Sequence, residues 1–321
     1  MNVLVTGGAG FIGSNFVRHL RTQHPEDRVV VLDALTYAGS LGNLDGIIAG
    51  VACTFIRGDV CDHAVLKHVF RTSVDAVVHF AAESHVDRSI AGAAAFVRTN
   101  VLGTQALLDA VRAAKVKRFV MISTDEVMGD LGPDDPPFDE SSPIHPNSPY
   151  AASKAAGEHL ALAAHRTHGL DVVVVRPTNN YGPFQFPEKF IPQAIVRAIE
   201  GKAIPVYGNG LNVRDWIHVS DCCYAIDLIL RSGRSGEVYC VGAEQEMVNY
   251  AVAKRVIDLV GRGSIEHVKD RKGHDRRYAV DASKIRRDLV WAPKIPSFVD
   301  GLRETVAWYK EHETWWRQAR T

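Results

Sequence analysis

Four polar residues directly follow an apolar run, residues 118–122, that is typical of a buried strand: Ser123, Thr124, Asp125 and Glu126. In an open α/β sheet, the carboxyl ends of the strands are where ligands bind. Further along, Tyr150 and Lys154 lie four residues apart at the start of a helical pattern, so they share one face of that helix. We expect these two segments to face each other across a bound molecule.

The Tyr150–Lys154 pair has the chemistry to remove a proton from a hydroxyl group. A tyrosine has an ordinary pKa of about 10, which makes it a poor base at neutral pH. A lysine ammonium one turn away, together with a positively charged nicotinamide ring, would favour the phenolate. The phenolate would then take the hydroxyl proton as a hydride leaves the same carbon. An exposed helix can carry such a pair by chance, but a dinucleotide motif upstream favours the catalytic interpretation.

That motif is Gly8-Ala9-Gly10-Phe11-Ile12-Gly13, which fits the pattern GxGxxG between an expected strand and an expected helix. Glycines allow the tight turn and let the backbone approach a pyrophosphate at the helix N-terminus. The next strand ends in Asp33, 20 residues after Gly13. Asp33 can accept hydrogen bonds from a ribose diol and would repel a 2′-phosphate, so the sequence favours NAD over NADP. Asp59 ends another strand and suits the adenine edge, although a helix N-cap would explain it as well.

The first half of the chain alternates short runs rich in valine and isoleucine with helical periods. Nearly continuous apolarity is typical of parallel strands that are covered on both faces. Such alternation predicts a Rossmann-like, doubly wound parallel sheet of the α/β class. The expected strands are 3–6, 28–33, 53–58, 76–81, 118–123 and 172–176, and the expected helices are 12–24, 64–70, 99–114 and 150–168.

After residue 177 the pattern changes, because proline and glycine recur and the clearest signals are the helices 190–200, 221–230, 250–260 and 298–310. We predict an NAD-binding domain at 1–177 and a smaller, mostly helical lobe at 178–321, with part of 212–241 returning to the first domain. The Pro- and Asp-rich segment 129–147 is expected to be a functional or mobile loop. Four aromatic residues near the C-terminus are expected to be packing anchors: Trp308, Tyr309, Trp315 and Trp316.

Composition and charge exclude several classes of protein. The formal net charge is zero, so no overall field favours nucleic acid or an anionic membrane. The five cysteines form no CxxC pair, so we expect neither a metal site nor disulfides. No apolar run is long enough to span a bilayer, and the first residues lead directly into a strand without signal-peptide features. These features predict a cytoplasmic protein.

Longer motifs, taken with Tyr150–Lys154, resemble those of the dTDP-glucose 4,6-dehydratases, a family within the extended short-chain dehydrogenase/reductase superfamily. The motifs are residues 6–13, 33 with 36–39, 81–89, 123–127, 179–183, 186–189, 212–216 and 273–278. They extend over nearly the whole chain, and the motif AAESHVDRS at 81–89 is highly specific. The resemblance implies NAD-dependent dehydration of a nucleoside-diphosphate glucose, most simply dTDP-glucose, to a 4-keto-6-deoxy sugar.

The resemblance also implies a role for each catalytic residue. Tyr150, with Lys154 beside it, would take the proton of the glucose 4-hydroxyl as hydride passes from C4 to NAD. Glu126 would remove the C5 proton, and Asp125 would protonate the departing 6-hydroxyl group before the hydride returns to C6. Thr124 would hydrogen-bond the C4 oxygen. Without the resemblance, Asp125 and Glu126 could equally be an acidic pair that starts a helix.

The binding residues are carried over in the same way, and a homodimer through helices 99–114 and 150–168 is expected. Arg214 and Asn249 would hold the diphosphate, since the planar guanidinium pairs well with phosphate oxygens, and Lys189 and Tyr207 would flank the base. The cofactor residues are Gly7, Gly10, Phe11, Ile12, Gly13, Asp33, Thr36, Asp59, Val60, Ala81, Ala82, Thr99, Tyr150, Lys154 and Asn179. The substrate residues are Ser84, Asn180, Lys189, Tyr207, Arg214, Asn249 and Tyr278.

One position departs from the family pattern. The family usually has tyrosine after Asp-Glu-Val, whereas this chain has Met128, a flexible thioether. Met128 either packs behind the strand end, which we favour, or alters the sugar pocket. A related nucleotide-sugar epimerase or decarboxylase therefore stays open, although simple 4-epimerisation needs no acid–base pair for C5 and C6. A non-catalytic NAD sensor is a further alternative, but it would have little use for Tyr150 and Lys154.

Overall fold

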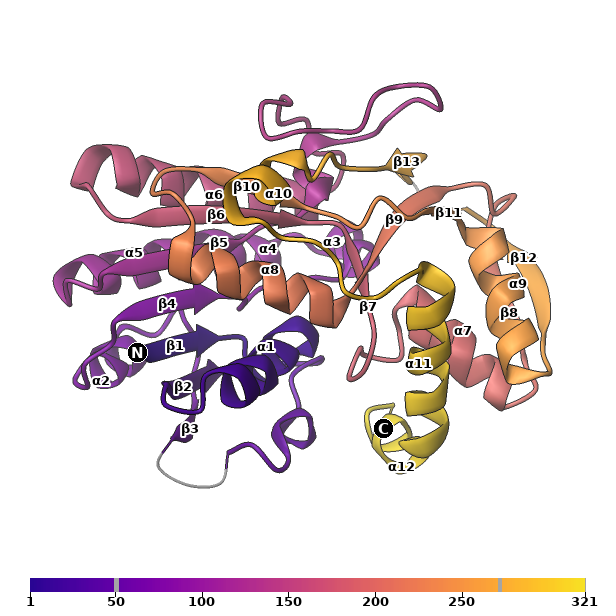
Figure 1. Cartoon of the computed structure of the whole chain (residues 1–321), viewed down its shortest axis with the longest axis horizontal. Coiled ribbons are helices and arrows are strands. Elements are labelled where there is room, and N and C mark those ends of the chain that lie inside the picture. The colour runs from indigo at the N-terminus through magenta and orange to yellow at the C-terminus, as the bar shows by residue number, and fades with distance from the viewer. Residues whose placement is uncertain (49–51, 271–272, 321) are drawn as a thin grey trace.

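The computed structural model describes residues 1–48, 52–270 and 273–320. Its main sheet contains the strands β1 (Asn2–Thr6), β2 (Arg28–Asp33), β3 (Cys53–Arg57), β4 (Ala76–His79), β5 (Arg118–Ile122), β6 (Val172–Pro177) and β10 (Val238–Val241). All are parallel, in the order β10-β6-β5-β4-β1-β2-β3 (Figure 1). This arrangement confirms the predicted doubly wound, Rossmann-like sheet.

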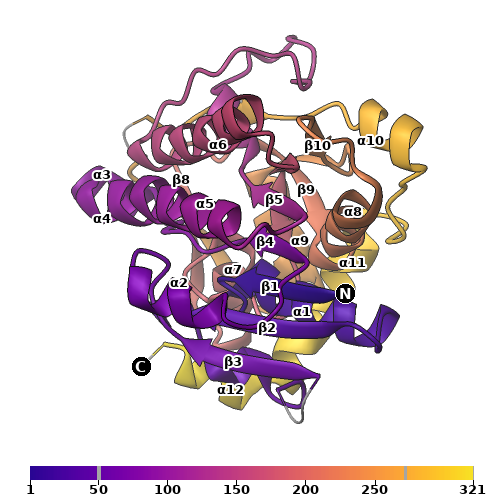
Figure 2. The ribbon, with the colours of Figure 1, turned by 90° about the vertical axis from the view of Figure 1, so that its left-hand side faces the viewer.

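Helices cover both faces of the main sheet (Figure 2). One face carries α1 (Phe11–Gln23) and α8 (Val219–Ser232), and the other carries α2 (His63–Val69), α5 (Thr104–Ala113) and α6 (Pro149–His168). Successive side chains of a strand point to opposite faces. In β1, accordingly, Val3 and Val5 belong to the first core and Leu4 to the second. Both faces are buried, so nearly continuous apolar strands are stable here.

The second lobe has its own core and lies beside the carboxyl ends of the main sheet (Figure 1). Its helices are α7 (Phe190–Ile199), α9 (Asn249–Val260), α11 (Phe298–Glu311) and α12 (Glu313–Gln318). One small sheet pairs β8 (Ala203–Tyr207) with β12 (Ser264–Val268). Another joins β9 (Val213–His218) to β7 (Asn179–Tyr181), β11 (Glu246–Val248) and β13 (Arg277–Tyr278). The helix α10 (Ser283–Leu289) packs on β10 and α8.

Several short elements border the carboxyl ends of the strands: η1 (Leu41–Leu44), α3 (Val86–Ala91), α4 (Ala94–Phe96), η2 (Val97–Gly103) and η3 (Asp125–Met128). The expected helix 99–114 begins as the π-helical turn η2 and continues as α5. Helix α6 packs closely on this turn, because an added Cβ at Gly157 would lie 2.6 Å from the Asn100 carbonyl oxygen. Segment 129–147 has no regular helix or strand, and an isolated bridge joins Phe138 to Val280.

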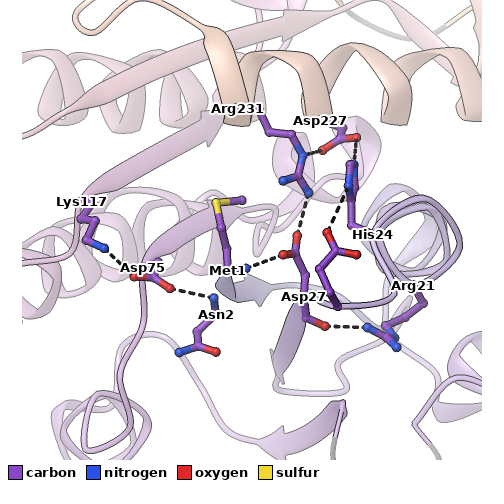
Figure 3. A network of polar contacts seen from close by, with 10 residues as sticks. Met1, Asn2, Arg21, His24, Asp27, Asp75, Lys117, Asp227 and Arg231 are labelled. Carbon is purple, nitrogen blue, oxygen red and sulfur yellow. Dashed lines mark hydrogen bonds and ion pairs between the residues drawn. The ribbon is translucent and has the colours of Figure 1, made fainter.

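A polar network joins α1 and α8 (Figure 3). Asp227 accepts hydrogen bonds from His19 (2.9 Å), His24 (2.8 Å) and Arg231 (2.7 Å), and Arg231 also pairs with Asp27 at 2.7 Å. Burial alone would raise the pKa of Asp227, but these hydrogen bonds outweigh it and lower that pKa to about 2. The ionised carboxylate of Asp227 therefore holds α1 and α8 together.

The five cysteines are free thiols. In the parts of the chain that the structure describes, no helix has both the length and the apolarity needed to cross a bilayer.

Candidate active site

A cavity of about 430 Å³ opens at the carboxyl ends of β1, β2, β4, β5 and β6. All of the predicted catalytic and cofactor residues line it, from the glycine-rich turn to Asn179. Three of the predicted substrate residues line it as well: Ser84, Asn180 and Lys189. The other four lie outside its lining: Tyr207, Arg214, Asn249 and Tyr278. The cavity therefore joins the expected dinucleotide end to the expected catalytic end.

The glycine-rich turn is packed so closely that side chains are excluded from it. Gly7 has a positive φ of 69°, and an added Cβ there would lie 2.5 Å from the Ala81 nitrogen. An added Cβ at Gly13 would lie 2.3 Å from the Gly7 carbonyl oxygen. Such a turn lets the backbone amides at the start of α1 approach a phosphate group.

Asp33 lies beside this turn and is held by the backbone. Its Oδ2 accepts a hydrogen bond from the Ala9 amide (2.9 Å), and its Oδ1 accepts one from the Leu35 amide (2.8 Å). Burial raises the pKa of Asp33, and these two hydrogen bonds oppose the rise. The carboxylate faces the cavity next to Thr36, where it fits a ribose diol and disfavours a 2′-phosphate. These residues thus fit NAD.

Further along the cavity, several buried polar atoms lack partners. Among the described residues, these lining atoms have no hydrogen-bond partner: Ser123 Oγ, Asp125 Oδ2, Thr178 Oγ1, Asn179 Oδ1, Asn180 Oδ1 and Gln185 Oε1. Buried polar groups are nearly always paired in native proteins. Their concentration here indicates that a polar ligand completes the site.

Thr124 caps η3 and places two carboxyl groups in different surroundings. Its hydroxyl accepts a hydrogen bond from the Glu126 amide (3.3 Å) and donates one to Asp125 Oδ1 (3.2 Å). Asp125 is only 2% exposed, whereas Glu126 is half-buried. Burial, and then the charges of Glu126 and Asp215, raise the pKa of Asp125 well above its usual range. The site therefore favours a protonated Asp125 next to Glu126.

Tyr150 lies in the first turn of α6, where the helix dipole favours negative charge. The Lys154 ammonium donates a hydrogen bond to the Ile122 carbonyl oxygen (2.5 Å), and burial lowers the pKa of Lys154 to about 8. Burial, and then the charge of Glu126, raise the pKa of Tyr150. Contrary to a simple interpretation of the Tyr–Lys spacing, the protein's own groups favour the neutral phenol.

The second lobe places two of the remaining predicted residues together. The Arg214 guanidinium lies 4.4 Å above the centre of the Tyr278 ring, and one of its nitrogens donates to the Asp275 carbonyl oxygen (2.9 Å). The charge of Arg214 acts on Asp125, and that of Glu126 acts on Tyr278, so this pair borders the catalytic end. Tyr207 is exposed at the end of β8, farther out.

Asn249 begins α9, directly after the residue of β11 that pairs with Val213. Its Oδ1 is buried without a partner in the described chain. On the cavity wall, Lys189 donates to the Ser84 carbonyl oxygen (2.9 Å). The predicted base-flanking residues Lys189 and Tyr207 therefore lie in different settings, one inside the cavity and one at the surface.

Known proteins identify the family. The chain is 53% identical to the dTDP-glucose 4,6-dehydratase of Streptomyces niveus, over 98% of this chain and 95% of the relative. The family model described as GDP-mannose 4,6 dehydratase matches residues 4–305. This chain belongs to the dTDP-glucose 4,6-dehydratase family.

Solved structures agree with this family membership. DesIV, the dTDP-glucose 4,6-dehydratase of Streptomyces venezuelae with NAD and TYD bound, matches with a TM-score of 0.96 and 50% identity, over 99% of this chain and 100% of DesIV. The UDP-glucose 4-epimerase of Thermus thermophilus, solved with NAD, matches with a TM-score of 0.90 and 31% identity, over 97% of this chain and 100% of the epimerase. Dehydratases and epimerases thus share this fold, and the site has to distinguish them.

The cavity of this family member also contains residues that sequence analysis assigned no role. Glu83, Tyr37 and Gln185 line it, and the first two lie within motifs that were recognised without a function for these positions. Asn100 lies behind it and holds the Glu83 backbone at both its amide (2.8 Å) and its carbonyl oxygen (3.0 Å). The same Asn100 amide donates to Ser153 Oγ at 2.8 Å. The π-helical turn, which positions Asn100, has no clear sequence signal.

Met128, the departure from the family pattern, lies in the core and not in the cavity lining. It is 2% exposed and packs with Val127, Ala155, Cys240 and Val280. Its sulfur lies 3.5 Å from an Arg176 nitrogen that belongs to a buried ion pair with Glu158. Met128 therefore packs behind the strand end, as the favoured interpretation expected.

Proposed function

We propose that this chain catalyses the NAD-dependent dehydration of dTDP-glucose to the 4-keto-6-deoxy sugar. The observation that carries the proposal is the contrast between two adjacent carboxyl groups in the cavity. Asp125 is buried with a raised pKa, and Glu126 is half-buried. Elimination of water needs one protonated acid for the leaving hydroxyl group and one ionised base for the C–H proton, and unlike surroundings provide both. The dehydratase relatives, at about half identity, support dTDP-glucose as the substrate.

The cofactor residues fit NAD through the glycine-rich turn, Asp33 and the unpartnered Asn179 oxygen. When bound, NAD supplies the hydride chemistry, taking hydride from C4 of glucose and returning it to C6. The turn would hold the pyrophosphate, and Asp33 with Thr36 would hold the adenine ribose. Asn179 would hold the carboxamide end.

Tyr150 would act as the base in the first proton transfer. Its phenolate would accept the proton of the 4-hydroxyl group, while the Thr124 hydroxyl would turn its one proton from Asp125 Oδ1 to the C4 oxygen. Lys154 donates a hydrogen bond to the Ile122 carbonyl oxygen and would supply positive charge one helical turn from Tyr150. Burial raises the pKa of Tyr150, and the positive charges of Lys154 and of bound NAD would oppose that rise.

Asp125 and Glu126 would catalyse the elimination of water. A ketone at C4 acidifies the C5 proton, so the carboxylate of Glu126 would accept it and would give a proton back to C5 when C6 is reduced. Protonated Asp125 would give its proton to the 6-hydroxyl group, so the C6–O bond breaks and water leaves. Asp125 Oδ2, which accepts no hydrogen bond from any residue that the structure describes, can make that contact. Ser84, Asn180 and Tyr278 would hold the sugar and its phosphates, Arg214 and Asn249 the diphosphate, and Lys189 and Tyr207 the base.

A related epimerase shares the fold and NAD, so the experiment has to separate the two activities. The protein is incubated with NAD and dTDP-glucose in deuterated water. Dehydration gives a 4-keto product with alkali-induced absorbance, deuterium at C5 and the former C4 hydride at C6. A C4 epimer without deuterium at C5 would identify an epimerase, and bound NAD without any conversion would identify a sensor. A panel of other nucleotide sugars in the same assay tests which base and which sugar the protein accepts.

We also propose that the protein is a homodimer. Large apolar side chains are exposed along α3 and η2, namely Ile90 (44%), Val97 (48%) and Leu102 (60%). Apolar patches of this kind mark protein–protein contacts. Light scattering should give twice the chain mass, and Leu102→Glu should shift the mass to that of one chain. A wild type that scatters as one chain would exclude the dimer.

We propose that residues 1–177 form an NAD-binding domain and residues 178–321 a nucleotide-sugar lobe, following the roles proposed above for the cofactor and substrate residues. The pairing of β10 with β6 supports the return of part of 212–241 to the first domain. Free cysteines support a cytoplasmic location, because thiols stay reduced there. Fractionation of the producing cells tests that location.

A further inference from the structure

The C-terminal aromatic cluster reaches the glycine-rich turn through one buried amide. Asn43 in η1 is 1% exposed, and its Nδ2 donates a hydrogen bond to the Ala9 carbonyl oxygen (2.8 Å). Its Oδ1 accepts a hydrogen bond from the indole N–H of Trp315 in α12 (2.9 Å). The side chain of Asn43 therefore connects the last helix of the second lobe to the centre of the turn.

Chemistry allows only one orientation of this amide. A carbonyl oxygen can only accept and an indole N–H can only donate, so the Asn43 amide group must point its nitrogen to Ala9 and its oxygen to Trp315. Ala9 is then held at both ends, because its amide donates to Asp33 and its carbonyl oxygen also accepts from the Ser40 amide (3.1 Å). The turn and the ribose-facing carboxylate are thus parts of one hydrogen-bonded unit.

Trp315 itself is fixed by the second lobe. Its ring lies 5.1 Å from that of Trp308 and 5.8 Å from that of Phe184. The neighbouring Trp316 is fully buried and donates to the Tyr309 carbonyl oxygen at 2.8 Å. A rigid aromatic anchor on one lobe therefore determines where the indole N–H meets Asn43 on the other.

We infer that Trp315 is a positioning residue for NAD, which acts through Asn43 on the glycine-rich turn. The inference rests on the proposed cofactor site. The turn tolerates little displacement, because its glycines already lie in contact with Ala81 and with one another. Loss of the indole N–H leaves a buried amide oxygen unpaired and loosens the turn where the pyrophosphate binds. The reacting groups Asp125 and Glu126 belong to a different strand end and are not affected.

The test compares Trp315→Phe with Trp308→Phe. Both exchange an indole for a phenyl ring in the same aromatic cluster, but only the first removes the donor to Asn43. For Trp315→Phe we expect NAD affinity, measured by equilibrium dialysis, to weaken roughly 3- to 30-fold. At saturating NAD, kcat and the KM for dTDP-glucose should change less than about twofold. Trp308→Phe should bind NAD as the wild type does.

A second variant tests the other end of the connection. Asn43→Asp keeps an acceptor for Trp315 but removes the donor to Ala9, and it should also weaken NAD binding. Effects of the two changes should be less than additive in the double variant, because both break one chain of hydrogen bonds. Unchanged NAD affinity in Trp315→Phe, or equal losses in both tryptophan variants, would overturn the inference. A wild type that binds no NAD would instead contradict the proposed function, and the inference with it.

Discussion

Replacement of Asp125 by asparagine should stabilise the protein and nearly abolish its turnover. The two side chains have almost the same shape, so packing is kept while the titrating group is lost. Asp125 is 2% exposed, and burial raises its pKa well above the usual range. In the unfolded chain its pKa returns to about 3.9.

The sign of the stability change follows from proton binding. Above about pH 4 the unfolded chain releases the proton of Asp125, whereas the folded protein keeps it. Wild-type stability therefore falls as pH rises from the unfolded pKa to the folded pKa, by about 1.4 kcal/mol per pH unit. Asparagine binds no proton in either state. The unfolding free energy of Asp125→Asn should thus exceed that of the wild type, by a margin that grows over this pH range.

The loss of activity has a separate cause. Asparagine can donate a hydrogen bond to the 6-hydroxyl group but cannot transfer a proton to it. Loss of a general acid typically costs about 10²- to 10⁴-fold in rate, or about 3–5 kcal/mol in the barrier. Removal of the C5 proton depends on Glu126, so exchange of C5 with deuterated solvent should continue in the variant.

Urea unfolding from pH 5 to 8, C5 exchange by NMR and the 4-keto assay check these expectations. Asp139→Asn is the matched control, because hydrogen bonds from Ser141 and Ser142 lower the pKa of this exposed carboxylate. A lowered pKa in the folded protein adds stability at every pH above the pKa of the unfolded chain. Asp139→Asn should therefore lose stability at neutral pH and keep its turnover. If Asp125→Asn were no more stable than the wild type at pH 7, Asp125 would be ionised in the folded protein. If the variant turned over normally, Asp125 could not be the acid.

Three further changes test other parts of the site. Tyr150→Phe should lower kcat by about 10²- to 10⁴-fold with NAD binding kept, by dialysis, since it removes only the acid–base hydroxyl; normal turnover would exclude Tyr150 as the base. Met128→Ala should cost about 2–5 kcal/mol in urea unfolding without a change of preferred nucleotide sugar, because Met128 lies in the core; an altered preference would place it in the sugar pocket. Gly13→Ala should abolish NAD binding, by dialysis, since its Cβ would meet the Gly7 carbonyl oxygen at 2.3 Å; wild-type affinity would contradict this packing.

The main sheet was predictable because its strands are buried on both faces. Val172–Pro177, for example, is apolar for most of its length. A short apolar run of this kind is typical of a parallel strand that is covered on both faces. The short strands of the second lobe had no comparable signal. Arg277–Tyr278 has only two residues and becomes a strand because β9 offers it backbone partners. Such pairing is decided by tertiary packing, which local sequence does not record.

The dinucleotide end and the substrate end of the site also differ in how far the sequence predicts them. At the dinucleotide end, the glycine-rich turn is one continuous motif that the sequence shows directly, and its residues Gly7, Gly10, Phe11, Ile12 and Gly13 line the cavity. The substrate end draws on separate strands and helices. Arg214 and Tyr278 could be named only through the family resemblance, and their contact depends on the pairing of β9 with β13. Asn100 was missed because a π-helical turn positions it.

The acid pair shows what the fold adds to the residues. In sequence, Asp125 and Glu126 are equivalent neighbours, and either could be the acid or the base. Thr124 caps η3, and in this short helix the Asp125 side chain is buried whereas Glu126 is half-buried. Burial then penalises the charged form of Asp125, and the remaining charge of Glu126 reinforces that penalty. Glu126 thus helps to set the protonation of Asp125, so Glu126→Gln should lower the pKa of Asp125 and reduce the stability gained from Asp125→Asn.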